Sequence, residues 1–352
     1  MVQKFWLLLL RIYIKTGLFF YTKRIKVLGK QNIPKKGAVL FAVNHPNGLI
    51  DPLYVTTTNK RTNHYLVRAA SFKNPIVKKV LAFLHLMPIY RIRDGIQQLA
   101  NNQEIFEKCF GILKKGDALM IFPEGSHDKK RTIRPLSKGF TRIISGALEK
   151  HPDLEIRIVP VGITYQHISN FPAKVCINYG KPIATKKIFE ANALAKAIHI
   201  LKSEVSEQLK KRIVHINDDE NYNKTLQKLN DAQVDFTNVD VVNLMIKNNT
   251  IPKKKEPKKN YLTPLFYLII LNSIIPYVLW KIAAKKIDEI EFIDTFRFSL
   301  NLVFCTIFYS LQTWIIVVFY GSLFGFLYLT FAVLLVLIYV KFAPTNAKKY
   351  EE

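Results

Sequence analysis

The stretch that most constrains the fold of this chain runs from Phe298 to Val340, 43 residues without a charged side chain. A helix needs about 20 apolar residues to cross a bilayer, so this stretch is long enough for two membrane-spanning helices. Gly321 lies near its middle, where a turn between the two helices is expected. We therefore predict a transmembrane hairpin over residues 298–340 and a chain that is embedded in a membrane at its C-terminal end.

A second uncharged segment, Asn260–Trp280, precedes the hairpin and contains two prolines. Lysine-rich runs flank it, KKKEPKK at 253–259 and KIAAKK at 281–286. If the segment crossed the membrane, the two runs would lie on opposite sides, against the tendency of basic residues to stay cytoplasmic. We therefore expect a re-entrant or interfacial segment over residues 261–280, within a membrane region that extends to residue 342.

The first 26 residues form another apolar run, which lacks the small-residue cleavage site of a signal peptide. Arg11 and Lys15 are four residues apart and would share one side of a helix. We expect an amphipathic helix over residues 1–26 that lies in the membrane interface. A buried or membrane-spanning helix is the alternative interpretation.

The formal net charge of +26 requires an anionic partner, either nucleic acid or the headgroups of anionic lipids. Lysines that flank apolar segments favour lipid, and the sequence contains no nucleic-acid-binding signature. Three scattered cysteines without a CxxC spacing argue against a disulfide framework and against a structural zinc site. We expect membrane lipids and no nucleic acid among the partners, with the main domain on the cytoplasmic face.

Between residues 27 and 185, short apolar runs alternate with segments of helical periodicity. Helical spacing marks 94–115 and the stripe of apolar residues within 140–148. Such alternation predicts an α/β domain over 27–185, a mixed sheet flanked by helices, whose sites lie where strands end. The expected strands lie in 37–45, 64–69, 86–91, 117–125, 156–165 and 174–183.

Two further segments lie between this domain and the membrane region. We expect a helical extension over residues 186–250, with one long helix across 185–215 and a weaker helical stretch up to about residue 248. Residues 251–260 are rich in Pro, Asn and Lys, which is typical of a linker. The chain is thus predicted to combine an α/β domain, a helical segment and C-terminal transmembrane helices.

The motif NHPNGLIDP, residues 44–52, places His45 six positions before Asp51 at the end of a predicted strand. A neutral imidazole can take a proton from a hydroxyl at neutral pH, and a carboxylate on its other nitrogen stabilises the cation that forms. The alternative is purely structural. Asp51 and Pro52 are also a common helix start, with Asp as the N-cap and Pro in the first turn.

A second motif, FPEGSHDKKRTIRPLSKGF at 122–140, follows another predicted strand and is crowded with cations. Backbone amides around Gly125 and these cations would suit a phosphate group. The alternative is a solvated basic loop, because most runs of charged residues form solvated surface segments. The presence of Glu124 among the cations favours a functional site.

Together, NHPNGLIDP, PIYRIRDG at 88–95, the FPEGSHDKK segment and IVPVGITY at 158–165 resemble the four ordered blocks of the glycerolipid acyltransferase superfamily. The resemblance covers residues 20–185 and implies acyl transfer in phospholipid synthesis. The implied donor is acyl-CoA or acyl carrier protein, and the implied acceptor is glycerol-3-phosphate or 1-acylglycerol-3-phosphate. It implies no metal and no cofactor beyond the donor as co-substrate.

The resemblance also implies roles for individual residues. His45 is the general base and Asp51 its orienting partner, while Arg91 contacts the phosphate of the acceptor. Three residues of the third block, Glu124, Gly125 and Ser126, shape the acceptor site, and Pro160 matches the proline of the fourth block.

Two departures from the family pattern concern spacing and charge. Five residues separate His45 from Asp51 where the family usually has four, and Ser126–His127 replaces Thr-Arg. Lys129 or Arg131 is then expected to replace the missing arginine. Both departures are similar to a branch that acts on glycerol-3-phosphate or dihydroxyacetone phosphate, which favours a first-step acceptor.

Two alternatives stay open. One is an acyltransferase for another lipid acceptor, such as a lysophospholipid or an amino-acid lipid. The other is a catalytically dead, membrane-anchored lipid-binding scaffold. A dead domain would tolerate loss of His45, Asp51 or Glu124, and all three are present.

Overall fold

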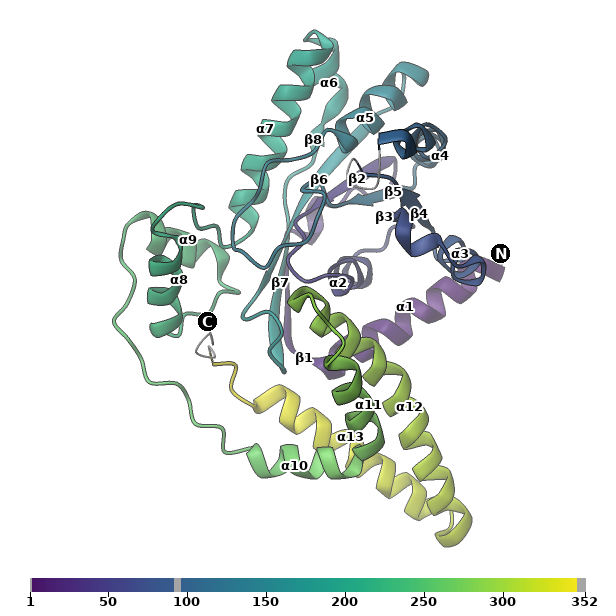
Figure 1. Cartoon of the computed structure of the whole chain (residues 1–352), viewed down its shortest axis with the longest axis vertical. Coiled ribbons are helices and arrows are strands. Elements are labelled where there is room, and N and C mark those ends of the chain that lie inside the picture. The colour runs from purple at the N-terminus through teal and green to yellow at the C-terminus, as the bar shows by residue number, and fades with distance from the viewer. Residues whose placement is uncertain (1, 92–95, 347–352) are drawn as a thin grey trace.

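A computed structural model describes residues 2–91 and 96–346 of the chain. Within these residues, strands form one mixed sheet in the order β1-β7-β6-β2-β5-β3-β4, with β8 paired to β6 (Figure 1). Neighbouring strands are parallel except where β6 meets β7 and β8. The predicted α/β class with a mixed sheet is confirmed. The strands are β1 Thr22–Leu28, β2 Ala38–Val43, β3 Asn63–Arg68, β4 Leu86–Ile89, β5 Ala118–Ile121, β6 Ile156–Tyr165, β7 Ala173–Tyr179 and β8 Ile183–Ala184.

Helices cover both faces of this sheet. Strand β2 is buried along its whole length, as expected for a central strand between two layers. Leu40 packs in the core formed with α4, α5 and α7, whereas Phe41 packs in the core formed with α1 and α2. These helices are α1 Val2–Tyr21, α2 Ile50–Thr58, α4 Asn102–Lys114, α5 Gly139–Lys150 and α7 Leu194–Arg212; α3, Pro75–Phe83, links β3 to β4.

Helix α1 is shorter than predicted. The helix ends at Tyr21, and residues 22–28 form the edge strand β1, which pairs in parallel with β7. Alternation of polar and apolar residues in TKRIKVL is the strand period, so the tertiary pairing with β7 decides the conformation of this segment. The prediction of a helix up to residue 26 was therefore wrong at its end.

The helical extension differs from the prediction in one respect. The single helix expected across 185–215 is two helices, α6 Thr185–Glu190 and α7, because the chain breaks at residues 191–193. The side chain of Asn192 donates to the carbonyl of Ile188 at 3.0 Å, which satisfies a terminal carbonyl and ends α6. Helices α8, Tyr222–Asp231, and α9, Val239–Lys247, follow and pack against Cys176 of β7.

The C-terminal region contains the predicted hairpin. Helices α12, Ile293–Tyr320, and α13, Ser322–Phe342, are both long and apolar enough to cross a membrane. The turn between them lies at Gly321, whose φ of +89° favours glycine. Helix α12 begins five residues before the predicted span, so Asp294 and Arg297 lie within its first turns.

The segment before the hairpin is bent. Helices α10, Thr263–Asn272, and α11, Ile274–Ala284, meet at an angle of 97°, with the break at Ser273. The hydroxyl of Ser273 pairs with that of Tyr309 on α12 at 2.6 Å, which ties the bend to the hairpin. Such a bend is compatible with a broken span or a re-entrant loop, and the interfacial placement of 261–280 stays a prediction.

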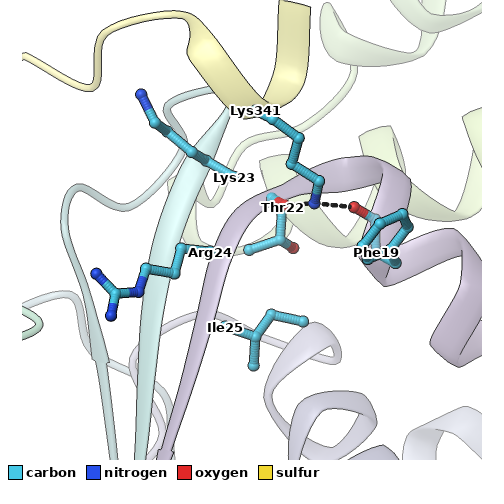
Figure 2. Close-up of a pocket in the computed structure, with 6 residues that line it drawn as sticks. All are labelled: Phe19, Thr22, Lys23, Arg24, Ile25 and Lys341. Carbon is cyan, nitrogen blue, oxygen red and sulfur yellow. Dashed lines mark hydrogen bonds between the residues drawn. The ribbon is translucent and has the colours of Figure 1, made fainter. Parts of the chain in front are cut away.

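Two lysines join the hairpin to the N-terminal helix (Figure 2). Lys341 of α13 donates to the carbonyls of Phe19 and Thr22 at 2.6 and 2.8 Å, at the end of α1. Lys23, just after α1, donates to the carbonyls of Phe342 and Ala343 at the end of α13. Each helix C-terminus is thus capped by a cation from the other segment. A pocket of about 350 Å³ opens beside these caps, and none of its lining residues belongs to the predicted site.

Candidate active site

The structure brings His45 and Asp51 together. His45 lies in the loop after β2, and its Nδ1 is 2.9 Å from Oδ2 of Asp51 in the first turn of α2. Asp51 is fully buried and accepts two more hydrogen bonds, from the backbone amide of Asn47 at 2.8 Å and from the hydroxyl of Tyr165 at 2.7 Å. A carboxylate held this way fixes the proton of a neutral imidazole on Nδ1 and leaves Nε2 free as a base.

The five-residue spacing between the pair is accommodated by a tight loop. Gly48 has a left-handed φ of +53°, and a Cβ atom there would lie 2.7 Å from the carbonyl oxygen of Glu291. Leu49 is the N-cap of α2, and Asp51 is the second residue of the helix. The N-cap interpretation of Asp51 is therefore wrong, since its carboxylate faces His45.

The third block lies directly against His45. The ring of Phe122 stacks on the imidazole, with ring centres 3.9 Å apart. Glu124 is largely buried and accepts two hydrogen bonds from Arg134, from its backbone N–H and its Nε, each 3.1 Å long. Burial raises the pKa of Glu124, while the bonds from Arg134 and from the backbone of His45 oppose that rise. Glu124 thus links the His45 loop to the basic loop.

Arg134 is a site residue that the sequence did not single out. Besides Glu124, its guanidinium donates to Oγ of Ser126 at 2.8 Å and to the backbone oxygen of Ser126. In the sequence it is one of several cations in the same loop, with no spacing that separates it from the rest. The signal that could have found it is the need of a buried carboxylate, Glu124, for a cationic partner.

Arg91 also reaches the third block. Its guanidinium donates to the carbonyl of Gly125 at 2.7 Å, from the end of β4. Gly125 is exposed and has a φ of +78°, a conformation that favours glycine. The rest of the second block, residues 92–95, lies outside the described residues.

Lys129 and Arg131 lie farther along the basic loop. Both line a small cavity of about 20 Å³ together with Asn44 and Pro46 of the His45 loop. The guanidinium of Arg131 donates to the carbonyls of Tyr165 and Gln166 at 3.0 and 2.9 Å. Lys129 is exposed. The structure therefore directs Arg131 toward the end of β6, and the phosphate contact of either residue stays a prediction.

His127, which stands where the family has arginine, lies beside His45 with ring centres 5.8 Å apart. Its Nε2 is hydrogen-bonded to the carboxylate of Glu289, in the segment that leads to α12. Ligand atoms of His127, Glu289 and Glu291 lie within 4.8 Å of one another. Exposed carboxylates of this kind cluster commonly without an ion, and we assign no metal to the group.

The start of α12 is also part of the site, which the sequence did not predict. Oδ2 of Asp294 accepts hydrogen bonds from the side-chain amide of Asn47 at 2.8 Å and from the backbone amide of Ser169 at 3.0 Å. Oδ1 accepts from the hydroxyl of Tyr21 at 2.6 Å and pairs with Arg297. Asn47 and Asp294 are both buried, so the His45 loop is bonded to the start of α12 through a buried polar network.

This arrangement supports two chemical functions. The oriented imidazole of His45 can accept a proton from a hydroxyl, and the cations beside it can hold an anionic group near that hydroxyl. The thiols of Cys109 and Cys176 are buried, and burial raises the pKa of both. Neither is suited to act as a nucleophile, because the thiolate is the reactive form.

Comparison with known proteins shows what the chain is similar to. Residues 24–164 match the model of the family described as Acyltransferase. Over 83 residues the chain is 31% identical to glycerol-3-phosphate O-acyltransferase 1 of Saccharomyces cerevisiae, a match that covers 24% of this chain and 11% of that protein. It is 28% identical over 159 residues to a probable 1-acyl-sn-glycerol-3-phosphate acyltransferase of Mycoplasma pneumoniae, covering 44% of this chain and 54% of that one.

A third relative is the 1-acyl-sn-glycerol-3-phosphate acyltransferase of Borreliella burgdorferi, 29% identical over 132 residues, which are 38% of this chain and 50% of the relative. The chain therefore spans between about a tenth and about a half of the length of these curated relatives. The crystal structure of the 1-acyl-sn-glycerophosphate acyltransferase PlsC from Thermotoga maritima aligns with a TM-score of 0.39 and 18% identity, over 60% of this chain and 82% of that one.

Proposed function

We propose that the chain is a membrane-bound O-acyltransferase of the glycerolipid acyltransferase superfamily, on the basis of the match of residues 24–164 to the Acyltransferase family model and of the similar proteins described above. The proposed reaction moves a fatty acyl group from acyl-CoA or acyl carrier protein to glycerol-3-phosphate or 1-acylglycerol-3-phosphate. The observation that carries the proposal is the 2.9 Å contact between His45 and the buried Asp51 beside a cationic loop. A scaffold without activity has no need of this contact.

The proposed mechanism follows from the dyad. Nε2 of His45 takes the proton of the acceptor hydroxyl as its oxygen attacks the thioester carbonyl, and a tetrahedral oxyanion forms. Collapse of that intermediate breaks the carbon–sulfur bond, and the leaving thiolate takes the proton back from the imidazolium. Asp51, held by Asn47 and Tyr165, stabilises the imidazolium between these two steps. The products are an ester and a free thiol, without an acyl-enzyme.

Cations around the dyad support a phosphate-bearing acceptor. Arg91, bonded to Gly125, and Arg134, bonded to Ser126, bring two guanidinium groups to the third block. A guanidinium presents several donors in one plane and is well matched to phosphate oxygens. The His127 substitution in the block is similar to the branch that acts on glycerol-3-phosphate, which makes that acceptor our first choice.

Membrane attachment is part of the proposal. Helices α12 and α13 are its main support, because both are long and apolar enough to cross a bilayer. The lysine runs at 253–259 and 281–286 and Lys341 at the end of α13 favour a cytoplasmic α/β domain.

The test is an acyl-transfer assay on the purified full chain reconstituted in phospholipid vesicles. Long-chain acyl-CoA and acyl carrier protein are offered as donors, and glycerol-3-phosphate and 1-acylglycerol-3-phosphate as acceptors. We expect ester formation with one donor and one acceptor, and its loss in His45→Ala. Equal transfer by the variant would refute the general-base role, and no transfer by the wild type to either acceptor would favour another acceptor or the scaffold.

A further inference from the structure

Helix α3 has an exposed apolar face. In a β-α-β unit the connecting helix usually buries an apolar stripe against the sheet. None of the nine residues of α3 is buried among the described residues. Ile76 is 73% exposed, Val80 52% and Phe83 42%, and their spacing of four and three residues places them on one side of the helix. An apolar stripe left open in this way indicates a partner.

The N-terminal half of α1 presents a second apolar face beside α3. Phe5, Leu8 and Ile12 are each more than half exposed, and their spacing of three and four residues places them on one side of the helix. The two helices are joined by a 2.9 Å hydrogen bond from the side chain of Gln3 to the carbonyl of Phe83 (Figure 1). Arg11 instead faces the domain and donates to the carbonyl of Arg61 at 2.7 Å. The apolar side of α1 is therefore turned away from the sheet.

The charge around these helices identifies the partner. Residues 1–91 contain 16 lysines and arginines but a single acidic residue, Asp51, which is fully buried. Lys73, Lys78 and Lys79 lie on or next to α3, and all three are exposed. Exposed apolar side chains next to lysines complement the surface of an anionic bilayer. Glu104 of α4, an exposed carboxylate that interacts with Lys78, is itself paired with Lys108 at 2.6 Å.

We propose that α3, together with the N-terminal half of α1, forms a lipid-contact face that docks on an anionic phospholipid bilayer. Ile76, Val80 and Phe83 enter the headgroup region, and the three lysines lie at the level of the phosphates. The proposal rests on the membrane placement of the proposed enzyme and deepens it. Because α3 leads directly into β4, docking holds the arginine at the end of β4, Arg91, near the lipid surface.

The experiment measures the depth of a single tryptophan in the full chain. The three native tryptophans, Trp6, Trp280 and Trp314, are changed to Phe, and Val80→Trp is introduced. The matched control is Leu194→Trp, at the first residue of α7, which is 58% exposed. The end of α7 next to α6 lies opposite the hairpin (Figure 1). Both proteins are reconstituted in vesicles that contain an anionic phospholipid and a doxyl-labelled phospholipid.

We expect several-fold stronger quenching by the doxyl lipid at position 80 than at position 194, and the reverse order for aqueous iodide. Adding K73Q, K78Q and K79Q together should reduce the lipid quenching at position 80, as should replacement of the anionic phospholipid by a zwitterionic one. Equal quenching profiles at the two positions would overturn the proposal. A second result would also overturn it. If the protein in detergent has the mass of a dimer and position 80 is shielded from iodide, the face joins two copies of the chain.

The readout is independent of acyl transfer. A protein with lipid-quenched position 80 but no transfer to either acceptor would refute the proposed function and leave the docking face in place. An active protein with equal quenching at both positions would refute the docking face and leave the proposed function in place. The two proposals can therefore fail separately.

Discussion

The side-chain amide of Asn47 donates a 2.8 Å hydrogen bond to Asp294, which lies 247 residues further along the chain. The backbone amide of the same Asn47 donates to Asp51, the partner of His45. One residue thus contacts both the carboxylate that orients the base and the carboxylate at the start of the membrane hairpin. The geometry of the proposed active site depends on where α12 lies.

Asp294→Asn should lower both stability and activity. The amide would turn a donor toward Asn47 and the backbone N–H of Ser169, and Arg297 would lose its buried partner. Removing one member of a buried ion pair typically costs about 3–5 kcal/mol. We expect a lower midpoint of thermal unfolding in detergent and a reduced kcat in vesicles. Asp288→Asn, an exposed carboxylate on the same segment, is the control, and equal behaviour of the two variants would contradict a positioning role.

Asp51→Asn should reduce activity far more than Tyr165→Phe, because Asp51 contacts His45 directly and Tyr165 contacts only Asp51. Asp51→Asn removes the charge that stabilises the imidazolium, and proton transfer of this kind contributes about 10²–10⁴-fold to the rate. Tyr165→Phe removes only one hydrogen bond to Asp51 and should cost far less activity. Rates of ester formation at saturating acceptor test the order. A Tyr165→Phe loss as large as that of Asp51→Asn would assign Tyr165 a direct role.

Glu289→Gln should improve binding of a phosphate-bearing acceptor. The carboxylate of Glu289 pairs with His127 close to His45, where it repels an incoming phosphate. Without its charge, we expect a lower KM for glycerol-3-phosphate at low salt, and a smaller difference at high salt because ions screen the repulsion. Steady-state kinetics at two ionic strengths measure both. Glu149→Gln, at an exposed position near the C-terminal end of α5, should leave KM unchanged.

His167→Phe should reduce the decrease in folding stability that acidification causes. Burial, with repulsion from Arg131 and Lys174, lowers the pKa of His167 to about 3. The unfolded chain, with an ordinary histidine pKa of about 6.5, binds the proton first as the pH falls. The contribution of neutral His167 to the free energy of unfolding is therefore fully present above a pH of about 6.5. It is lost progressively as the pH falls toward the folded pKa, and the loss is about 2 kcal/mol at about pH 5.

Unfolding midpoints at neutral pH and at about pH 5 test this expectation for wild type and His167→Phe. The variant should lose less stability than the wild type between the two conditions. His199→Phe, at an exposed position of α7, should behave like the wild type. An unchanged pH dependence in His167→Phe would show that other groups control acid stability.

Local patterns in the sequence were sufficient for several parts of the structure. The run that ends at His45, the turn at Gly321 and the stripe of α5 all depend on residues close together in the chain, where periodicity and turn chemistry act. The contact of His45 with Asp51 belongs to the same class, because six positions along one loop separate them. The fold class followed from the alternation of such segments.

Long-range partners were not predictable in this way. Tyr165 lies 114 residues from Asp51 and reads in the sequence as one more apolar strand residue. Asp294 and Arg297 immediately precede an uncharged stretch, so in the sequence they resemble the polar flank of a membrane span. Residues 22–26, TKRIK, follow the apolar run of α1 and carry three cations, and pairing with β7 makes them part of a strand. In each case the deciding partner is distant in the sequence.

The bond between Asn47 and Asp294 also has a consequence for biosynthesis. The ribosome completes His45 and Asp51 long before it reaches α12, so the nascent α/β domain lacks one wall of its own site. That wall comes with the start of α12, one of the two helices long and apolar enough to cross a membrane. The His45 loop therefore acquires its full set of hydrogen bonds only after the chain has been made as far as Asp294.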